Sequence, residues 1–302
     1  MRVLASSFLT LLWVVLAGAG GSTLAAETPV RVVVSFSILD DIVHEVGGRD
    51  VAVTSLIGRD ANEHVFEPRP EQVRLLTQAR LFVVNGLGLE GWLPRLVQSA
   101  QYRGLLVVAT EGVAPLMRAE AGERAPTPDP HAWQDVQNGA IYAENIARAL
   151  AAMDPGHAEA YQQRFAHYRV ELEALDHNVR EKLGAIPPEK RRVITSHDAF
   201  AYYGRAYGVA FLAPEGLSTE SEPSARTVAA LIRQIRRDGI RALFLENISD
   251  PRLMQEIARE TGASLGPPLY SDALSGPDGP APTYTQMIEY NTAVLKEGML
   301  KN

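Results

Sequence analysis

The sequence of 302 residues contains no cysteine. This absence excludes disulfide bonds, metal sites built from thiolates, and cysteine nucleophiles. It also leaves no residue for a lipid anchor on the mature N-terminus, so we expect a chain that is not lipid-anchored. Basic residues are scarce as well, because 29 Lys and Arg stand against 36 Asp and Glu, which gives a net charge of -7. We see no basic stripe, and we therefore expect no nucleic acid among the partners.

The first residues have the pattern of a secretory signal peptide. Arg2 precedes an apolar run over residues 8–19 that is short for a membrane span, and the small residues Ala25 and Ala26 follow it. We place the signal peptide at residues 1–26 and expect a periplasmic protein after its removal. A membrane anchor is the alternative interpretation of the same run.

Short apolar runs alternate with amphipathic segments in the first half of the chain. This alternation predicts a parallel sheet with helices on both faces, in an N-terminal α/β lobe of residues 27–154. Buried parallel strands are typically short and apolar throughout. The strands are expected at 30–36, 51–57, 81–86 and 105–110, and the helices at 38–48, 70–79 and 133–153.

A second α/β set fills the C-terminal part, which we assign to a lobe of residues 186–302. Its expected strands are 192–197, 209–214 and 241–247, and its expected helices are 224–239, 251–262 and 284–299. The fold class is therefore α/β, with two lobes that each contain a parallel sheet.

The segment between the lobes predicts one long helix. Residues 158–183 contain neither Gly nor Pro, and apolar residues recur at steps of three and four. We therefore expect a rigid linking helix over residues 155–185 rather than a flexible linker. Its histidines, His157, His167 and His177, are ten residues apart and do not align on one face. We interpret them as solvated surface residues.

Three other histidines and one aspartate occupy loops next to predicted strands or helices. They are His64 in 60-DANEHVFEPRP-70, His131 in 129-DPHAWQD-135, His197 in 195-TSHDAFAYYG-204 and Asp272 in 268-PLYSDALSG-276. Functional loops of α/β lobes lie at the carboxyl ends of strands, so two ligands from each lobe can meet in the cleft between them. Three imidazoles and a carboxylate suit tetrahedral Zn²⁺. A hard, oxygen-rich site would favour Mn²⁺ or Mg²⁺ instead, and a single loop histidine is more often a surface residue.

Several further side chains have two interpretations. Glu246 is either a hydrogen-bond partner of a ligand histidine or a structural acceptor, and Asp129 and Asp198 are weaker candidates for the same role. Glu220 and Glu222 are better explained by the N-terminus of the helix that follows them. Asp278 lies in a predicted turn, so we prefer Asp272 as the ligand. Trp133 and Phe66 either shield a metal or belong to the core.

The chain resembles the metal-specific solute-binding proteins of ABC importers, the TroA/ZnuA-like family, over nearly all of its mature length. The resemblance rests on 64-HVFEPRPEQ-72, 130-PHAWQD-135, 196-SHDAFAYYGRAYG-208, 217-LSTESEPSARTVAALI-232, 244-FLENISDPRLMQEIARETG-262, 271-SDALS-275 and 288-IEYN-291. It implies two α/β lobes joined by one rigid helix, with a metal held between them by His64, His131, His197 and Asp272. It also implies a transport protein, not an enzyme, whose partners are an ABC permease and its ATPase.

This sequence departs from the family pattern at three points. Many members have Asp-Pro-His at the first ligand, where this chain has 62-NEH-64. Several zinc-specific members carry a histidine-rich loop before the second ligand, whereas residues 117–129 contain no histidine, which leaves room for a separate periplasmic metal donor protein. Members that select manganese commonly have Glu at the third position, so His197 favours Zn²⁺.

We therefore expect a monomer that carries Zn²⁺ as its transported ligand. A Mn²⁺ carrier of the same fold is the main alternative. A secreted zinc hydrolase is the other one, although the sequence has no HExxH motif and four protein ligands would close the zinc shell.

Overall fold

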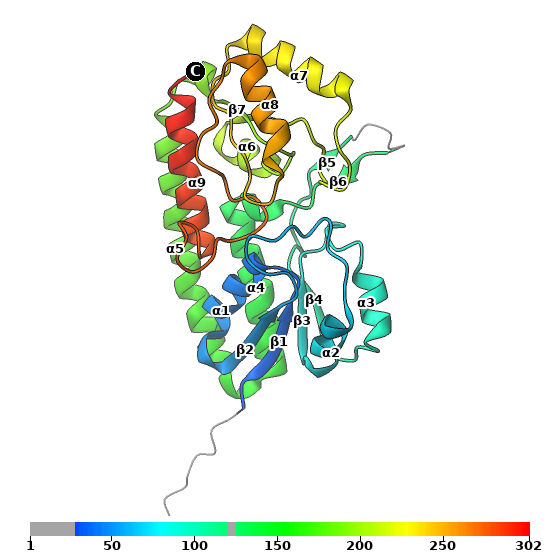
Figure 1. The fold of residues 1–302 in the computed structure, drawn as a ribbon. Helices are drawn as coiled ribbons and strands as arrows, with labels where there is room; N and C mark the ends of the chain where they lie inside the picture. Colours follow the sequence, from blue (N-terminus) through cyan, green and yellow to red (C-terminus); the bar gives the residue numbers. More distant parts are fainter. Residues whose placement is uncertain (1–27, 120–124) are drawn as a thin grey trace, which may run out of the picture.

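The structure is a computed structural model that describes residues 28–119 and 125–302 (Figure 1). The predicted signal peptide lies outside the described residues. Among the residues that the structure does describe, no helix combines the length and the hydropathy that a membrane span needs.

The strands are β1 (Val30–Val34), β2 (Val51–Ser55), β3 (Leu81–Val84), β4 (Leu105–Val108), β5 (Met117–Arg118), β6 (Thr127–Pro128), β7 (Arg192–Ile194) and β8 (Ala210–Leu212).

The helices are α1 (Ser37–Gly47), α2 (Pro70–Gln78), α3 (Leu93–Ser99), α4 (Val136–Met153), α5 (Ala158–Gly184), α6 (Ala201–Tyr207), α7 (Ala225–Asp238), α8 (Pro251–Thr261) and α9 (Tyr284–Met299). The predicted helices are confirmed to within a few residues, and α3 and α6 are two helices that the sequence analysis did not predict. Short 3₁₀ turns include η2 (Ala132–Gln134) and η3 (Pro155–His157).

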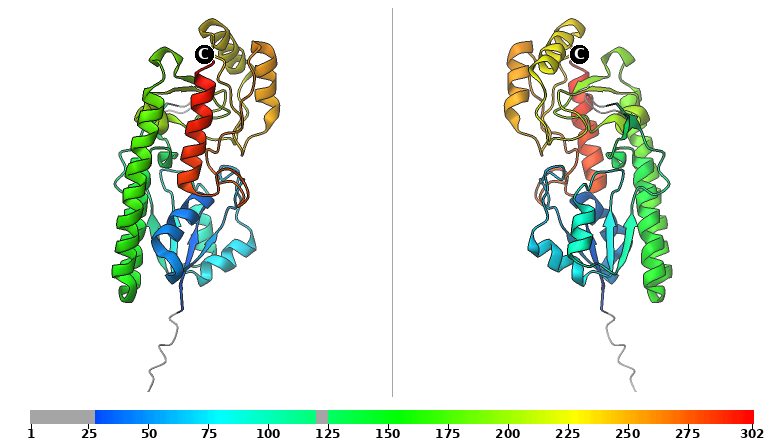
Figure 2. Two further views of the ribbon diagram at one scale, coloured as in Figure 1. Left: turned by 90° about the vertical axis from the view of Figure 1, so that its left-hand side faces the viewer. Right: turned by 90° about the vertical axis from the view of Figure 1, so that its right-hand side faces the viewer.

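The N-terminal lobe is built on a parallel sheet with the strand order β2-β1-β3-β4. All four residues of β3 are buried, as expected for a strand between two parallel neighbours with helices on both faces. Helices α1, α4 and α5 lie on one side of the sheet, and α2 and α3 lie on the other (Figures 1 and 2). The parallel sheet that the sequence predicts is therefore confirmed.

The C-terminal lobe has less regular sheet than the sequence predicts. Strands β7 and β8 pair in parallel, but the expected strand over 241–247 is reduced to isolated parallel bridges at Leu243 and Glu246. The predicted strand was therefore too long. The neighbouring segment contains Pro267 and Pro268, which have no N–H to donate, so a continuous ladder cannot form there.

Helix α5 runs along one side of the molecule past both lobes, with α9 beside it (Figure 2). Its buried residues recur with helical spacing and are Tyr161, Tyr168, Leu172, Leu175, Val179 and Leu183. They belong to one hydrophobic cluster that extends from β1 to Met299 at the end of α9. A smaller cluster lies under α7 and α8. The long rigid helix between two α/β lobes, as the sequence predicts, thus shares its core with both.

Candidate metal centre

Four side chains from distant parts of the chain meet where the two lobes join. His64 comes from the loop between β2 and α2, and His131 directly precedes η2. His197 follows β7, and Asp272 lies between the bridge at Leu269 and α9. One potential ligand atom of each lies within 4.8 Å of those of the others. The side chains of His131, His197 and Asp272 are fully buried, and that of His64 is 5% exposed.

The distances between these atoms match the edges of a small coordination polyhedron. Asp272 Oδ2 lies 3.0 Å from His197 Nε2 and 3.6 Å from His64 Nε2. Asp272 Oδ1 lies 3.8 Å from His131 Nε2, which is 3.3 Å from His64 Nε2. Ligand atoms about 2.0–2.1 Å from one tetrahedral Zn²⁺ are about 3.3 Å apart. The four residues that sequence analysis singled out therefore lie together in a geometry that suits a divalent metal.

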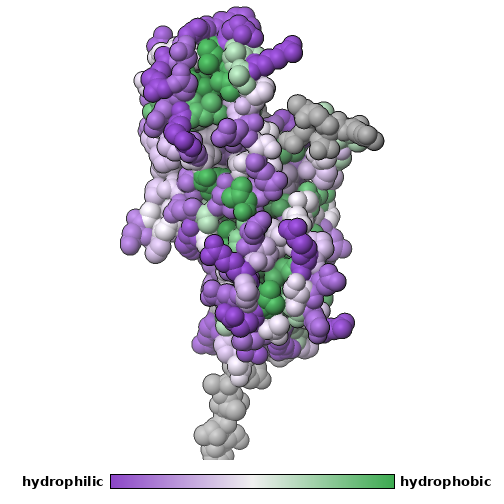
Figure 3. Space-filling view, turned by 45° about the vertical axis from the view of Figure 1, so that its right-hand side comes forward, coloured by the Kyte–Doolittle hydropathy of each residue, from purple (hydrophilic) through white to green (hydrophobic). Residues whose placement is uncertain are grey.

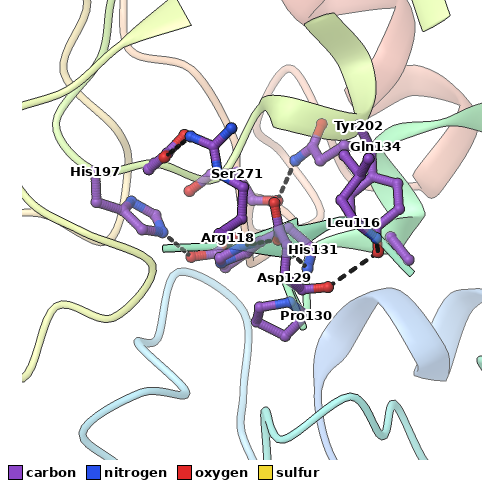
Figure 4. A network of polar contacts seen from close by, with 12 residues as sticks. Leu116, Arg118, Asp129, Pro130, His131, Gln134, His197, Tyr202 and Ser271 are labelled. Carbon is purple, nitrogen blue, oxygen red and sulfur yellow. Dashed lines mark hydrogen bonds and ion pairs between the residues drawn. The ribbon is translucent and has the colours of Figure 1, made fainter. Parts of the chain in front are cut away.

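Two of the imidazoles are oriented by a carboxylate on the side away from this centre. His131 Nδ1 lies 2.8 Å from Asp129 Oδ1, which also accepts a hydrogen bond from the His131 backbone N–H (Figure 4). His197 Nδ1 lies 2.6 Å from Glu246 Oε2, and the His197 backbone N–H donates to Glu246 Oε1. A partner at Nδ1 leaves the Nε2 lone pair free for a metal. Both carboxylates are therefore partners of histidines in the four-residue group.

Burial and neighbouring charges have opposite effects on the pKa values of the groups at this site. Burial disfavours ionisation of Asp272, but the imidazoles of His197 and His131 outweigh it and hold the pKa of that carboxyl well below its usual range. Burial also acts to lower the pKa of His197, but Glu246 and Asp272 outweigh it and raise that pKa well above its ordinary value. For His64, burial prevails and lowers the pKa.

Glu63 is a buried residue of this region that sequence reasoning missed. Its side chain contacts the carboxyl of Asp272, and burial, followed by the charge of Asp272, raises the pKa of Glu63 well above its usual range. Neither of its oxygens has a hydrogen-bond donor among the described residues. Its position next to His64 in 62-NEH-64 is the only feature of the sequence that could have indicated this burial. A Glu in a polar loop is usually solvated.

The loop that carries His64 is held by the C-terminal lobe. Arg59 donates to the carbonyl oxygens of Ser275 and Pro282. The Asp60 carboxylate accepts hydrogen bonds from Asn247 Nδ2 and from the backbone N–H of Gly276. Asp60 has a positive φ of 52°, a conformation that Asp tolerates better than most residues. The loop that carries His64 is therefore held in place by contacts across the lobe boundary.

The segment that follows His131 also reaches across this boundary. Trp133 Nε1 and Gln134 Nε2 both donate to the carbonyl oxygen of Ser271, over 2.8 Å and 2.6 Å (Figure 4). Trp133 is fully buried, and its ring lies against those of Phe36 and His131. Trp133 thus belongs to the core, as one of the two interpretations predicts, and its ring contacts a histidine of the four-residue group. Phe66 packs against Trp92 beside the site.

The remaining candidates lie apart from the four ligand atoms. Glu220, Glu222 and Asp278 are exposed, and Asp198 pairs with Arg118 of β5. On the linking segment His167 and His177 are exposed as expected. His157 is partly exposed. It lies in η3 before α5, and its Nδ1 atom is 2.8 Å from Asp154 Oδ2.

A cavity of about 740 Å³ opens beside His64 between the lobes. Its walls combine apolar and charged side chains, namely Val65, Phe66, Glu67, Leu87, Leu89, Trp92, Arg95, Pro130, Leu217 and Glu220. In the space-filling view, hydrophobic residues are exposed in several patches among hydrophilic ones (Figure 3). His64, which lines this cavity, is the most exposed member of the four-residue group.

Comparison with known proteins identifies a matching family and similar proteins. The family model described as "Zinc-uptake complex component A periplasmic" matches residues 32–298. The iron-binding protein YfeA of Yersinia pestis is 34% identical over 89% of this chain and 86% of its own length. The manganese ABC transporter substrate-binding lipoprotein PsaA of Streptococcus pneumoniae is 30% identical over 97% of both chains.

Solved structures show the same architecture. The periplasmic zinc-binding protein TroA from Treponema pallidum superposes with a TM-score of 0.85 at 27% identity, covering 90% of this chain and 99% of that one. A manganese-bound periplasmic metal-binding protein from Candidatus Liberibacter asiaticus has a TM-score of 0.80 at 29% identity, covering 89% and 99%. The family match over residues 32–298, together with these relatives and structures, shows that the chain belongs to the family of periplasmic zinc-uptake components, the metal-binding proteins of ABC importers.

Proposed function

We propose that this protein is a periplasmic carrier that binds Zn²⁺ through His64, His131, His197 and Asp272 and delivers it to an ABC permease driven by its ATPase. The observation that carries the proposal is the set of three imidazole nitrogens and one carboxylate, within 4.8 Å of one another and shielded from solvent. This donor set satisfies the tetrahedral preference of Zn²⁺. Imidazole-rich sites also bind Zn²⁺ more tightly than Mn²⁺.

A manganese carrier is the second candidate, and the names of the relatives favour it. PsaA is named for manganese, YfeA is named for iron, and one structural neighbour was solved with Mn bound. A hydrolytic zinc site is a weaker alternative, because four protein ligands leave no open position for a reactive water. Ester or peptide turnover by the purified zinc-loaded protein would support that alternative.

We further propose a monomer with the domain boundaries 27–154, 155–185 and 186–302. The mature chain would be free in the periplasm, without a lipid anchor. Several relatives are named lipoproteins, but this sequence contains no cysteine to which a lipid could be attached. A separate periplasmic donor protein would supply the metal that the histidine-free loop at 117–129 does not collect.

The test is a competitive titration of the metal-stripped mature protein with Zn²⁺ and Mn²⁺, alongside the His197→Ala variant. We expect one Zn²⁺ per chain, bound more tightly than Mn²⁺, and a large loss of affinity in the variant. The exposed His177 provides a matched control, since His177→Ala is expected to bind Zn²⁺ like the parent protein. Preference for Mn²⁺ would overturn the choice of metal, and indifference to the loss of His197 would overturn the ligand set.

A further inference from the structure

The short segment from His131 to Gln134 serves both lobes at once. His131 presents Nε2 to the metal centre, while Trp133 Nε1 and Gln134 Nε2 donate to the carbonyl oxygen of Ser271 in the other lobe. Ser271 directly precedes Asp272. A carbonyl oxygen has two lone pairs, so these two donors occupy the full hydrogen-bonding capacity of that oxygen.

The carboxylate of Asp272 depends on its backbone for its position. No hydrogen bond from the described residues reaches either of its oxygens. Their contacts are the imidazoles of the other three ligands and the carboxyl group of Glu63. The Ser271 carbonyl and the Asp272 backbone nitrogen share one planar peptide unit. Holding the Ser271 oxygen therefore fixes the orientation of this peptide plane, and with it the backbone position from which the Asp272 side chain extends.

Gln134 is a costly residue to bury at this place. Its side chain is fully buried, and its Oε1 atom has no hydrogen-bond partner among the described residues. A buried polar atom without a partner destabilises the fold. An apolar side chain of similar size would avoid that cost, and Trp133 would still donate to Ser271. What Gln134 alone contributes is the second donor to the peptide before Asp272.

We propose that Gln134 is a positioning residue for the metal ligand Asp272, acting from the opposite lobe through the Ser271 carbonyl. The inference rests on the proposed function, because it takes Asp272 as a ligand. One lobe thereby contributes His131 to the metal and, three residues later, sets the orientation of a ligand that belongs to the other lobe. Displacement of one lobe relative to the other disturbs both ligands together.

The test compares zinc binding by the parent protein and by Gln134→Leu, which removes the donor and keeps an apolar volume close to that of glutamine. We expect the affinity to fall by about tenfold, in the range found when outer partners of metal ligands are removed, with faster zinc dissociation. The matched control is Gln137→Leu, because Gln137 is exposed on the first turn of α4, and it is expected to leave zinc binding unchanged. If Gln134→Leu is not folded, Gln134→Met keeps the side-chain length without the donor and replaces it.

A double-mutant cycle with Asp272→Ala separates positioning from a general structural effect. If Gln134 acts through Asp272, then Gln134→Leu has no further effect on zinc affinity once the carboxylate is gone. The same tenfold loss in both backgrounds, or no loss in the parent background, would overturn the inference. If Asp272→Ala by itself left zinc binding intact, the proposed ligand set would fail, which is a separate result from the failure of Gln134.

Discussion

Glu246 Oε2 and His197 Nδ1 lie 2.6 Å apart, and both side chains are completely buried. A second Glu246 oxygen accepts the backbone N–H of His197, so one carboxylate holds both the ring and the main chain of this residue. The pair makes the imidazole more basic and fixes its orientation, which strengthens its bond to a metal. The other nitrogen of the ring, Nε2, lies on the side of the four-residue group and is 3.0 Å from Asp272 Oδ2.

Replacing Glu246 with Gln should therefore weaken zinc binding. The amide keeps the size of the side chain but removes the negative charge beside the His197 ring. We expect a loss of affinity of about 10–100-fold, measured by competition with a chromophoric chelator. Glu256→Gln on the exposed face of α8 is the matched control. Unchanged affinity in Glu246→Gln would show that the carboxylate is a structural acceptor only.

Zinc affinity should rise with pH across the neutral range. Burial acts to lower the pKa of His197, but Glu246 and Asp272 outweigh it and raise that pKa in the metal-free protein. A proton therefore occupies this ring at pH values where an ordinary histidine is neutral, and Zn²⁺ must displace it. We expect the release of about one proton per Zn²⁺ near neutral pH. Titration calorimetry in buffers of different ionisation enthalpy measures this number, and an affinity that stays constant from pH 7.5 to pH 5 would contradict the prediction.

Asp41 on α1 should make the metal-free protein less stable as the pH rises. Its Oδ2 atom accepts the backbone N–H of Tyr284 at the start of α9, and burial raises its pKa to about 6. Because the folded pKa is above the unfolded one, stability present below about pH 4 is lost as the pH rises to about 6. Asp41→Asn removes this loss and keeps an acceptor for Tyr284.

The advantage of Asp41→Asn over the parent protein should therefore grow between pH 4 and pH 7, to at most about 3 kcal/mol. Urea unfolding of both proteins in the presence of a chelator, at several pH values, gives this difference. Ionisable groups at the metal site titrate in both proteins, so their contribution cancels. A difference that does not vary with pH would show that Asp41 is ionised without cost.

Gly139 should not tolerate a side chain, because α4 approaches Tyr284 closely there. A Cβ atom at this position would lie 2.6 Å from the Tyr284 hydroxyl, which donates to the Trp133 carbonyl and is fully buried. We expect Gly139→Ala to lower the free energy of unfolding by about 1–3 kcal/mol, since overpacking outweighs the gain in helix propensity. Gly184→Ala, where a Cβ meets nothing within 4 Å, is the control and should be neutral or stabilising in the same thermal unfolding experiment.

The sequence predicted well those features that depend on local patterns. The helix α5 ends within a few residues of its predicted limits, because an uninterrupted apolar stripe and the absence of Gly and Pro both act locally. Loop positions next to strands and helices make the four residues at the lobe boundary candidates, and the family resemblance implies the same set. These are signals that a single chain carries in its order of residues.

What the sequence could not show depends on contacts between distant segments. The pairing of His197 with Glu246 joins distant segments within the C-terminal lobe. The burial of Glu63 against Asp272 depends on how the two lobes meet. The two donors on the Ser271 carbonyl come from residues that are remote in sequence. The strand over 241–247 was overestimated because its apolar residues gave no sign of the two prolines in the segment that it faces.

The distribution of the four ligands along the chain has a consequence for biogenesis. His64 is in the first quarter of the sequence, whereas Asp272 comes only shortly before α9, the last helix. Because synthesis runs from the N-terminus, the histidines are made long before the last donor, Asp272. Binding of a metal by all four side chains therefore requires nearly the whole chain, so it follows synthesis rather than guiding early folding.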